Sequence, residues 1–155
     1  MKTRRSLGII LISAALILIV CITFFFKKKA EPYPFRFALA EIELETGISM
    51  AQSSLMLIDL AGPAQLDEKA GRPTTLREQL TTGRKGLMDR MRDLNPPPAD
   101  HRDAFARLRD LYAIYEQYAK AALAKDPKPL SKLENEMLTV QIARIKTDLQ
   151  VIRPR

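Results

Sequence analysis

The sequence has no tryptophan, one cysteine and one histidine among 155 residues, and only six glycines. One cysteine cannot form a disulfide within the chain, so packing has to hold the fold together. A covalent haem needs the pattern Cys-x-x-Cys-His and a di-iron bundle needs two Glu-x-x-His motifs, and neither pattern occurs. These shortages predict no cofactor, no metal site and no catalytic residue.

The single histidine, His101, lies in the sequence Asp100-His101-Arg102-Asp103. The tripeptide His-Arg-Asp also occurs in kinase catalytic loops, but the glycine-rich loop and the Asp-Phe-Gly motif that accompany it there are missing. We interpret this stretch as the first turn of a helix near a surface loop, where Asp100 and Asp103 favour the positive end of the helix dipole. Without a nucleophile and a base held by a third group, we do not expect an enzyme.

A long uncharged run occupies residues 7–26, and fourteen of its twenty residues are Leu, Ile, Val or Phe. As a helix it is about 30 Å long, which matches the hydrocarbon core of a bilayer. A cleaved signal peptide has a shorter apolar core of about 7 to 15 residues that ends in small residues, whereas this run ends in three phenylalanines. A lipoprotein signal is disfavoured because bulky Val20 precedes Cys21. The run therefore predicts an uncleaved transmembrane signal anchor.

Basic residues flank the predicted span on both sides. Residues 1–29 hold six of the 25 Lys and Arg residues and none of the 18 Asp and Glu residues, so the net charge of +7 arises mostly here. Lys27, Lys28 and Lys29 are expected to attract anionic lipid head groups, at about 1 kcal/mol each, and no nucleic-acid partner is predicted. The short basic N-terminal tail favours a domain outside the cytoplasm, whereas the triple lysine favours the opposite orientation. We expect a single-pass protein of a bacterial inner membrane with an extracytoplasmic domain.

The rest of the chain predicts an all-α fold, in which the single N-terminal transmembrane helix is followed by an antiparallel (up-down) four-helix bundle. The anchor covers 1–29, and residues 30–34 (AEPYP) form a proline hinge. Apolar residues recur every three or four positions through residues 35–155. The four expected helices cover about 35–60, 74–95, 99–125 and 131–152.

Helix boundaries are marked by prolines and by capping boxes. Two pairs of residues have the spacing of a capping box, in which each side chain accepts a hydrogen bond from the backbone amide of the other residue. These pairs are Thr75 with Glu78, and Ser131 with Glu134. Residues 61–73 form the longest expected loop. The last helix has an apolar stripe with four-three spacing, which Leu130, Leu133 and Met137 are expected to extend backwards: Leu138, Ile142, Ile145, Leu149 and Ile152.

Tyr112, Tyr115 and Tyr118 recur at every third position of the third helix. They could form an interaction face for a partner or ligand, but their spacing coincides with the apolar stripe, which favours a place in the core. The methionines of the domain are likewise expected to fill gaps in the bundle: Met50, Met56, Met88, Met91 and Met137.

The expected function is a non-catalytic interaction or scaffold module, anchored by a single span at the cell envelope. Its partners would be the lipid bilayer together with another membrane or envelope protein, or a second copy of itself. A sensory or small-ligand-binding domain is one alternative, although such receptors usually return through a second span. A peripheral domain that binds anionic lipid is another, and the net charge of only +1 over residues 30–155 argues against it.

Overall fold

A computed structural model describes residues 31–69 and 71–152. These residues form four α-helices and no strand, which confirms the all-α prediction and is consistent with a helical bundle. The predicted span 7–26 and its lysines Lys27, Lys28 and Lys29 lie outside the described residues. Within the described part of the chain, no helix combines the length and apolarity needed to cross a membrane. The elements are α2 (Tyr33–Ala61), the 3₁₀ helix η1 (Pro63–Leu66), α3 (Leu76–Asp93), the 3₁₀ helix η2 (Ala99–His101), α4 (Arg102–Leu123) and α5 (Lys132–Ile152).

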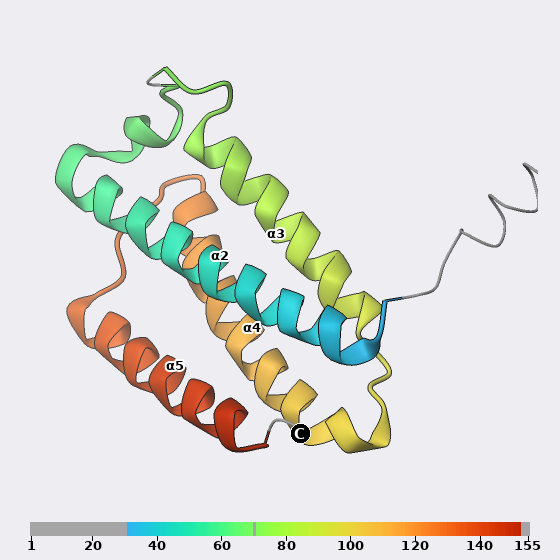
Figure 1. Cartoon of the computed structure of the whole chain (residues 1–155). Coiled ribbons are helices and arrows are strands. Elements are labelled where there is room, and N and C mark those ends of the chain that lie inside the picture. The colour runs from blue at the N-terminus through green and yellow to red at the C-terminus, as the bar shows by residue number, and fades with distance from the viewer. Residues whose placement is uncertain (1–30, 70, 153–155) are drawn as a thin grey trace, which may run out of the picture. The chain divides into compact units, whose positions relative to one another are not determined.

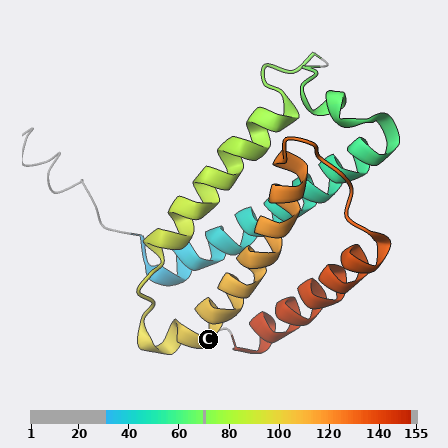
Figure 2. The ribbon, with the colours of Figure 1, turned by 180° about the vertical axis from the view of Figure 1, so that it is seen from behind.

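Successive helices of the compact unit Tyr33–Arg155 run in opposite directions (Figure 1). Helices α2, α3 and α4 pack against one another, and α4 lies behind α2 in the view of Figure 1. Among the described residues, the backbone of α5 packs closely against α4, beside which it lies in the view from behind (Figure 2), and α5 reaches α2 through side chains such as Lys146, which pairs with Glu45. The domain is therefore a three-helix group with a fourth helix attached along one side.

Both capping boxes are present and fix two helix starts. The Thr75 hydroxyl accepts a hydrogen bond from the Glu78 amide at 3.1 Å, and the Glu78 carboxylate accepts one from the Thr75 amide at 2.8 Å. The Ser131 hydroxyl accepts from the Glu134 amide at 3.3 Å, and the Ser131 amide donates to the Glu134 carboxylate at 3.0 Å. Each box satisfies amide groups that a helix start would otherwise leave without a partner.

The segment expected to be a long loop contains a short ordered element. Gly62 ends α2 with a positive φ of 87°, which a residue with a side chain rarely adopts. The 3₁₀ helix η1 follows at once and buries Leu66 completely. One leucine thus fixes a connection that glycine and proline content alone predicts to be irregular.

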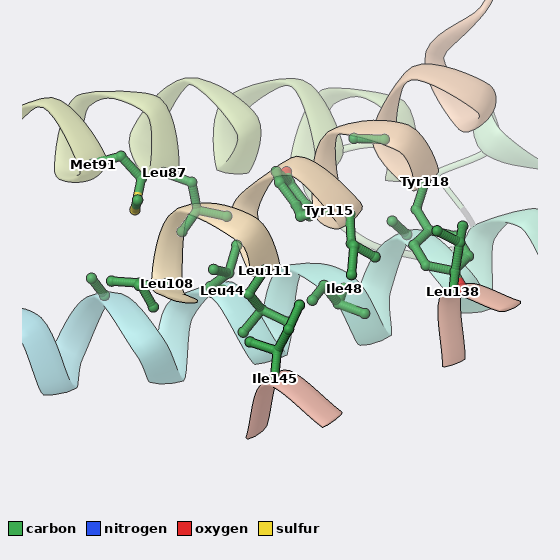
Figure 3. Packing of buried hydrophobic residues seen from close by; sticks show 14 of the residues in the cluster. Leu44, Ile48, Leu87, Met91, Leu108, Leu111, Tyr115, Tyr118, Leu138 and Ile145 are labelled. Atoms are coloured by element: carbon green, nitrogen blue, oxygen red, sulfur yellow. The ribbon is translucent and has the colours of Figure 1, made fainter. Parts of the chain in front are cut away.

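The core gathers around α4, where side chains from all four helices meet (Figure 3). A fully buried Leu, Ile, Phe or Met side chain stabilises the fold by about 1.5–3 kcal/mol relative to an exposed one. The core of the described chain is drawn wholly from residues 37–149, so the domain has its own core and the means to fold independently. Central members include Leu44, Ile48, Leu87, Met91, Leu108, Leu111, Tyr115, Tyr118, Leu138 and Ile145.

The start of α5 departs from the prediction. Leu133 and Met137 were expected to extend the buried stripe, but they are 68% and 54% exposed, so this prediction is wrong. A helix advances by about 100° per residue, which places these two residues on the side opposite to Ile145 and Leu149. The prediction that the methionines fill core gaps is also wrong for Met137, as it is for Met56 and Met88, which are more than half exposed.

Candidate binding grooves beside helix α2

Two grooves flank α2 on the surface of the domain. The groove between α2 and α3, here called the α2–α3 groove, has a volume of about 370 Å³. The groove between α2 and α5, here called the α2–α5 groove, has a volume of about 560 Å³. Helix α4 passes beneath both, so that Tyr115 lines the first and Tyr118 lines the second.

The α2–α3 groove is mostly apolar. Helix α2 supplies Ile42, Thr46 and Met50 along one wall. Buried Leu80 and Leu87 form much of the base together with Tyr115. The α3 wall above this base is formed by Gln79, Gly83, Gly86 and Arg90. Two of these four residues are glycines, so the middle of the wall has no side chains.

The glycines of this groove serve two different purposes. A Cβ atom on Gly47 would lie 2.9 Å from Leu87 Cδ1 and 3.0 Å from Tyr115 Cε2, so the absence of a side chain lets α2 approach its neighbours. A Cβ atom on Gly83 or Gly86 would meet no heavy atom within 4 Å. Each of these two costs about 0.5–1 kcal/mol relative to alanine inside a helix, and packing within the domain does not require them. Their effect is to leave the α3 wall of the groove open.

An ion pair joins the two walls of this groove. Arg90 on α3 donates to both carboxylate oxygens of Glu43 on α2, at 2.8 and 3.1 Å. Both side chains are about one third exposed, so solvent screens the pair and its contribution to stability is small. Its two-point geometry instead fixes the spacing of α2 and α3.

A second ion pair ties α3 to α4. Arg84 donates to both carboxylate oxygens of Glu116, with contacts of 2.9 and 2.7 Å, and the Tyr112 hydroxyl donates to the same carboxylate at 3.1 Å. The hydrogen bonds from Arg84 hold the pKa of Glu116 below its ordinary value. Burial, reinforced by the bond to the carboxylate, raises the pKa of Tyr112 to about 12. The network keeps Glu116 charged and Tyr112 neutral over the physiological range.

The α2–α5 groove has a mixed lining. Its walls include apolar residues such as Leu55, Met56 and Leu130, the acidic residue Asp59, and neutral polar side chains on both helices. The Tyr118 hydroxyl, at the base, donates to Asn135 Oδ1 at 2.9 Å and so ties α4 to the start of α5. The facing polar residues are Ser49, Gln52 and Ser53 on α2 and Asn135 and Thr139 on α5.

Two hydroxyl groups of this groove have already donated their protons. Ser49 donates to the carbonyl of Glu45 at 3.0 Å, and Thr139 donates to the carbonyl of Asn135 at 2.7 Å. Their oxygens therefore remain as hydrogen-bond acceptors for a bound molecule. Beyond Ser49, Lys146 on α5 reaches Glu45 on α2 at 2.9 Å. This ion pair bridges the two helices next to one end of the groove.

The three tyrosines of the predicted interaction face do not lie together on the surface. Tyr115 and Tyr118 are each 1% exposed and belong to the core, whereas Tyr112 is half-buried against Glu116. Each of the first two forms the base of a different groove. The sequence carries a signal for the grooves themselves, namely two glycines three residues apart in a helix and polar residues on facing helices, but periodicity alone does not reveal it.

His101 follows a largely exposed loop, as expected, but its own side chain is only 6% exposed. Its ring packs edge-on against Tyr33, with ring centres 4.9 Å apart, and Phe37 lies 6.3 Å away. The predicted helix turn is correct, but the aromatic side chains at the start of α2 cover it. His101 Nδ1 lies 3.0 Å from Asp100 Oδ1, and this contact helps to lower the pKa of Asp100.

Within residues 31–69 and 71–152, no group of three or more His, Cys, Asp and Glu residues is placed to hold a metal ion. Comparisons of the chain with protein families, with curated proteins and with solved structures find no match.

Proposed function

We propose that this protein is a membrane-tethered, non-catalytic interaction module, and that its α2–α3 groove receives an amphipathic helix of another envelope protein. The observation that carries this proposal is the apolar groove with one wall of nearly bare backbone. The tether rests on the uncharged run of residues 7–26, which also supports an inner-membrane location with the domain outside the cytoplasm.

The groove suits a helix because it runs between two helices and is apolar at its base. Amphipathic helices commonly bind in this way, with side chains at positions i, i+3, i+4 and i+7 as anchors. Gly83 and Gly86 would allow the backbone of the incoming helix to come close, and Met50 on the opposite wall can adapt its shape. The two glycines thus have a use outside the domain that matches their cost within it.

The rim of the groove narrows the chemistry of the partner helix. The α3 side carries Gln79 and the α2 side carries Thr46, and both side chains are neutral and polar. The two charged residues that line the groove, Glu43 and Arg90, already bind each other. A partner helix with an apolar seam and neutral polar flanks would complement both rims.

Site-specific photocrosslinking in the native membrane tests this proposal. A benzophenone amino acid at Thr46, which is exposed at the groove, is expected to form an adduct with a partner protein, whereas the same probe at exposed Arg109 on α4 is not. Gly86→Leu should abolish the Thr46 adduct by filling the groove. Thr82→Leu adds the same side chain to an exposed position of α3 outside the groove and should leave the adduct intact. Equal adducts at Thr46 and Arg109, or persistence of the adduct in Gly86→Leu, would contradict the proposal.

The location has its own test. An alkaline phosphatase fused after Arg155 is active only outside the cytoplasm, and a cytoplasmic fluorescent reporter gives the opposite readout. Phosphatase activity is the expected result. Fluorescence alone would refute the extracytoplasmic orientation and leave the groove proposal to its own experiment.

The α2–α5 groove favours a second candidate function, the binding of a small neutral polar ligand. Its volume of about 560 Å³ lies in the range typical of small-molecule sites. Ser53→Trp would fill it from the α2 wall. If this groove is the site, calorimetric titration with neutral sugars and amides should detect a ligand for the original domain and none for Ser53→Trp.

A further inference from the structure

The three tyrosines of α4 differ in what their hydroxyl groups bind. The Tyr112 hydroxyl donates to Glu116 at 3.1 Å, and the Tyr118 hydroxyl donates to Asn135 at 2.9 Å. The Tyr115 hydroxyl makes no hydrogen bond with any described residue, although this side chain is only 1% exposed. Buried polar groups of proteins nearly always have a hydrogen-bond partner. The domain therefore holds one deeply placed hydroxyl that it does not use itself.

This hydroxyl opens into the α2–α3 groove. Among the described residues, the fully enclosed side-chain polar atoms without a hydrogen-bond partner belong to Tyr33, Arg36 and His101, and not to Tyr115. The Tyr115 hydroxyl is therefore still reachable from solvent. Tyr115 lines the α2–α3 groove, and its side chain points toward α3, whereas that of Tyr118 points toward α5 (Figure 3). The groove thus has a hydrogen-bonding group at a base that is otherwise apolar.

The Tyr115 hydroxyl is a donor at neutral pH. Burial raises its pKa, and the negative charge of Glu116 raises it further, so the proton stays on the oxygen. A group that accepts this proton in the groove gains a hydrogen bond in a place from which a bound helix excludes water. An apolar group in the same place would leave the hydroxyl without a partner, which is unfavourable.

The walls of the groove add two acceptors to this donor. The Thr46 hydroxyl donates to the carbonyl of Ile42 at 2.9 Å, so its oxygen remains an acceptor. The Gln79 amide nitrogen donates to the Thr74 hydroxyl at 3.1 Å, and the Gln79 carbonyl oxygen remains an acceptor as well. Both Thr46 and Gln79 line the groove. One donor at the base and an acceptor on each wall complement a carboxamide, which has one carbonyl oxygen and two N–H donors.

We propose that the partner helix places one carboxamide side chain, Asn or Gln, within its otherwise apolar seam. Its carbonyl oxygen accepts a hydrogen bond from the Tyr115 hydroxyl, and its amide nitrogen donates to Thr46 or Gln79. This inference rests on the proposed function, because it names the chemistry of the helix that occupies the α2–α3 groove. A single buried polar residue fixes the register of paired helices. Tyr115 accordingly selects where along the groove the partner helix binds.

A carboxylate is disfavoured in the same place. It would accept from Tyr115 but bring no donor to the oxygens of the two walls. Among the described residues that line the groove, the only cation is Arg90, which already holds Glu43 through two contacts. A carboxylate from the partner would therefore lose its water without gaining a cation of its own.

Unfolding of the domain tests whether the Tyr115 hydroxyl is unused within it. Tyr115→Phe should leave the urea midpoint of residues 31–155 unchanged, because the removed hydroxyl has no partner there. Tyr118→Phe is the comparison, since it removes the hydrogen bond to Asn135 and should lower the midpoint. A fall of equal size in both variants would show that Tyr115 serves the fold and would overturn the inference.

Photocrosslinking of the full chain in its membrane tests the hydrogen bond to the partner. A benzophenone amino acid at Ile42, which lines the groove and is 62% exposed, leaves Tyr115 and both acceptors in place. With the partner expressed at graded levels, Tyr115→Phe should weaken its apparent binding about tenfold. Tyr112→Phe is the matched control, because its hydroxyl binds Glu116 outside the groove, and should leave the adduct unchanged.

The crosslinked segment of the partner decides the chemistry. Mass spectrometry of the adduct should identify an amphipathic helix with Asn or Gln in its apolar seam. Replacing that residue by Leu should weaken binding as much as Tyr115→Phe does, and the two changes together should cost no more than either alone, because they remove the same bond. Binding that Tyr115→Phe leaves unchanged, or a seam without a carboxamide, would overturn this inference and leave the groove proposal intact. Absence of an adduct at Ile42 in the original protein would instead refute the groove proposal itself.

Discussion

Replacing Gly47 with alanine is expected to destabilise the helical domain, although alanine is the better helix former. The new Cβ atom would lie 2.9 Å from Leu87 Cδ1 and 3.0 Å from Tyr115 Cε2. Both contacted atoms belong to side chains that are 4% and 1% exposed and form the base of the α2–α3 groove. The strain is absorbed by turning of these two side chains and by a shift of α2 against α3 and α4.

The expected loss follows from two opposing effects. Glycine to alanine inside a helix gains about 0.5–1 kcal/mol. Forcing an extra methyl group into a close-packed core costs about 1–3 kcal/mol. The net change at Gly47 is therefore a loss of about 0–2.5 kcal/mol.

Gly83→Ala provides the matched control, because it is the same chemical change in a helix where the new methyl group meets no atom within 4 Å. It should stabilise the domain by about 0.5–1 kcal/mol. Urea unfolding of a fragment of residues 31–155, followed by circular dichroism, measures both variants. If Gly47→Ala stabilised the domain as much as Gly83→Ala does, the close contact of α2 with Leu87 and Tyr115 would be refuted.

Three further predictions concern hydrogen bonds of α4. The pKa of Glu116 is lower in the folded protein than its ordinary 4.5, chiefly through Arg84, so this carboxylate contributes stability above that pH. This contribution should be lost as the pH falls through 4.5 toward the pKa of the folded state. Urea unfolding midpoints measured at a series of pH values should therefore fall on the acid side, and less steeply in Glu116→Gln. The same slope in both proteins would contradict the assignment. The pKa of Tyr112 shifts in the opposite direction, from 10.0 to about 12 on folding, so the free energy of unfolding should fall as the pH rises from 10.0 to 12. The fall should be smaller in Tyr112→Phe. Circular dichroism measures the unfolding, and tyrosinate absorbance records the ionisation. Tyr118→Phe removes the hydrogen bond to Asn135 and should lower the free energy of unfolding by about 1 kcal/mol. Amide hydrogen exchange should become faster in the first turns of α5 and stay unchanged in α3. Equal acceleration in both helices would count against a local role.

The helices and their starts were predictable because local sequence determines them. The prolines at 96–98 end one helix, and the capping boxes of Thr75 and Ser131 begin two others through bonds that span only three residues. The expected ranges 74–95 and 131–152 therefore agree with the observed Leu76–Asp93 and Lys132–Ile152 to within about two residues at each end.

The surroundings of each helix face were not predictable in the same way. Periodicity shows which residues share a face, but it does not show which face finds a neighbour. Helix α5 has two apolar faces, and the one that begins with Leu133 was assigned to the core because it precedes the buried stripe in the sequence. The burial of His101 depends on Tyr33 and Phe37, which are remote in sequence.

The grooves are also products of tertiary arrangement. The α2–α5 groove brings Ser53 and Asn135 together from two helices, and no local pattern in the sequence shows which helices face each other. The α2–α3 groove depends on Gly83 and Gly86, which the sequence shows only as residues that weaken a helix.

The contacts of Tyr33 determine how the domain responds to mechanical force. Tension carried along the chain enters α2 at Tyr33, its first residue, where the amides of a helix start lack partners and a helix would ordinarily peel apart. Here the Tyr33 ring lies against His101 at the start of α4, and Arg36 in the same turn donates to the carbonyl of Asp93 at the end of α3, at 3.0 Å. Three helices thus share the tension from the first turn, and the domain resists extension as one body rather than unwinding from the start of α2.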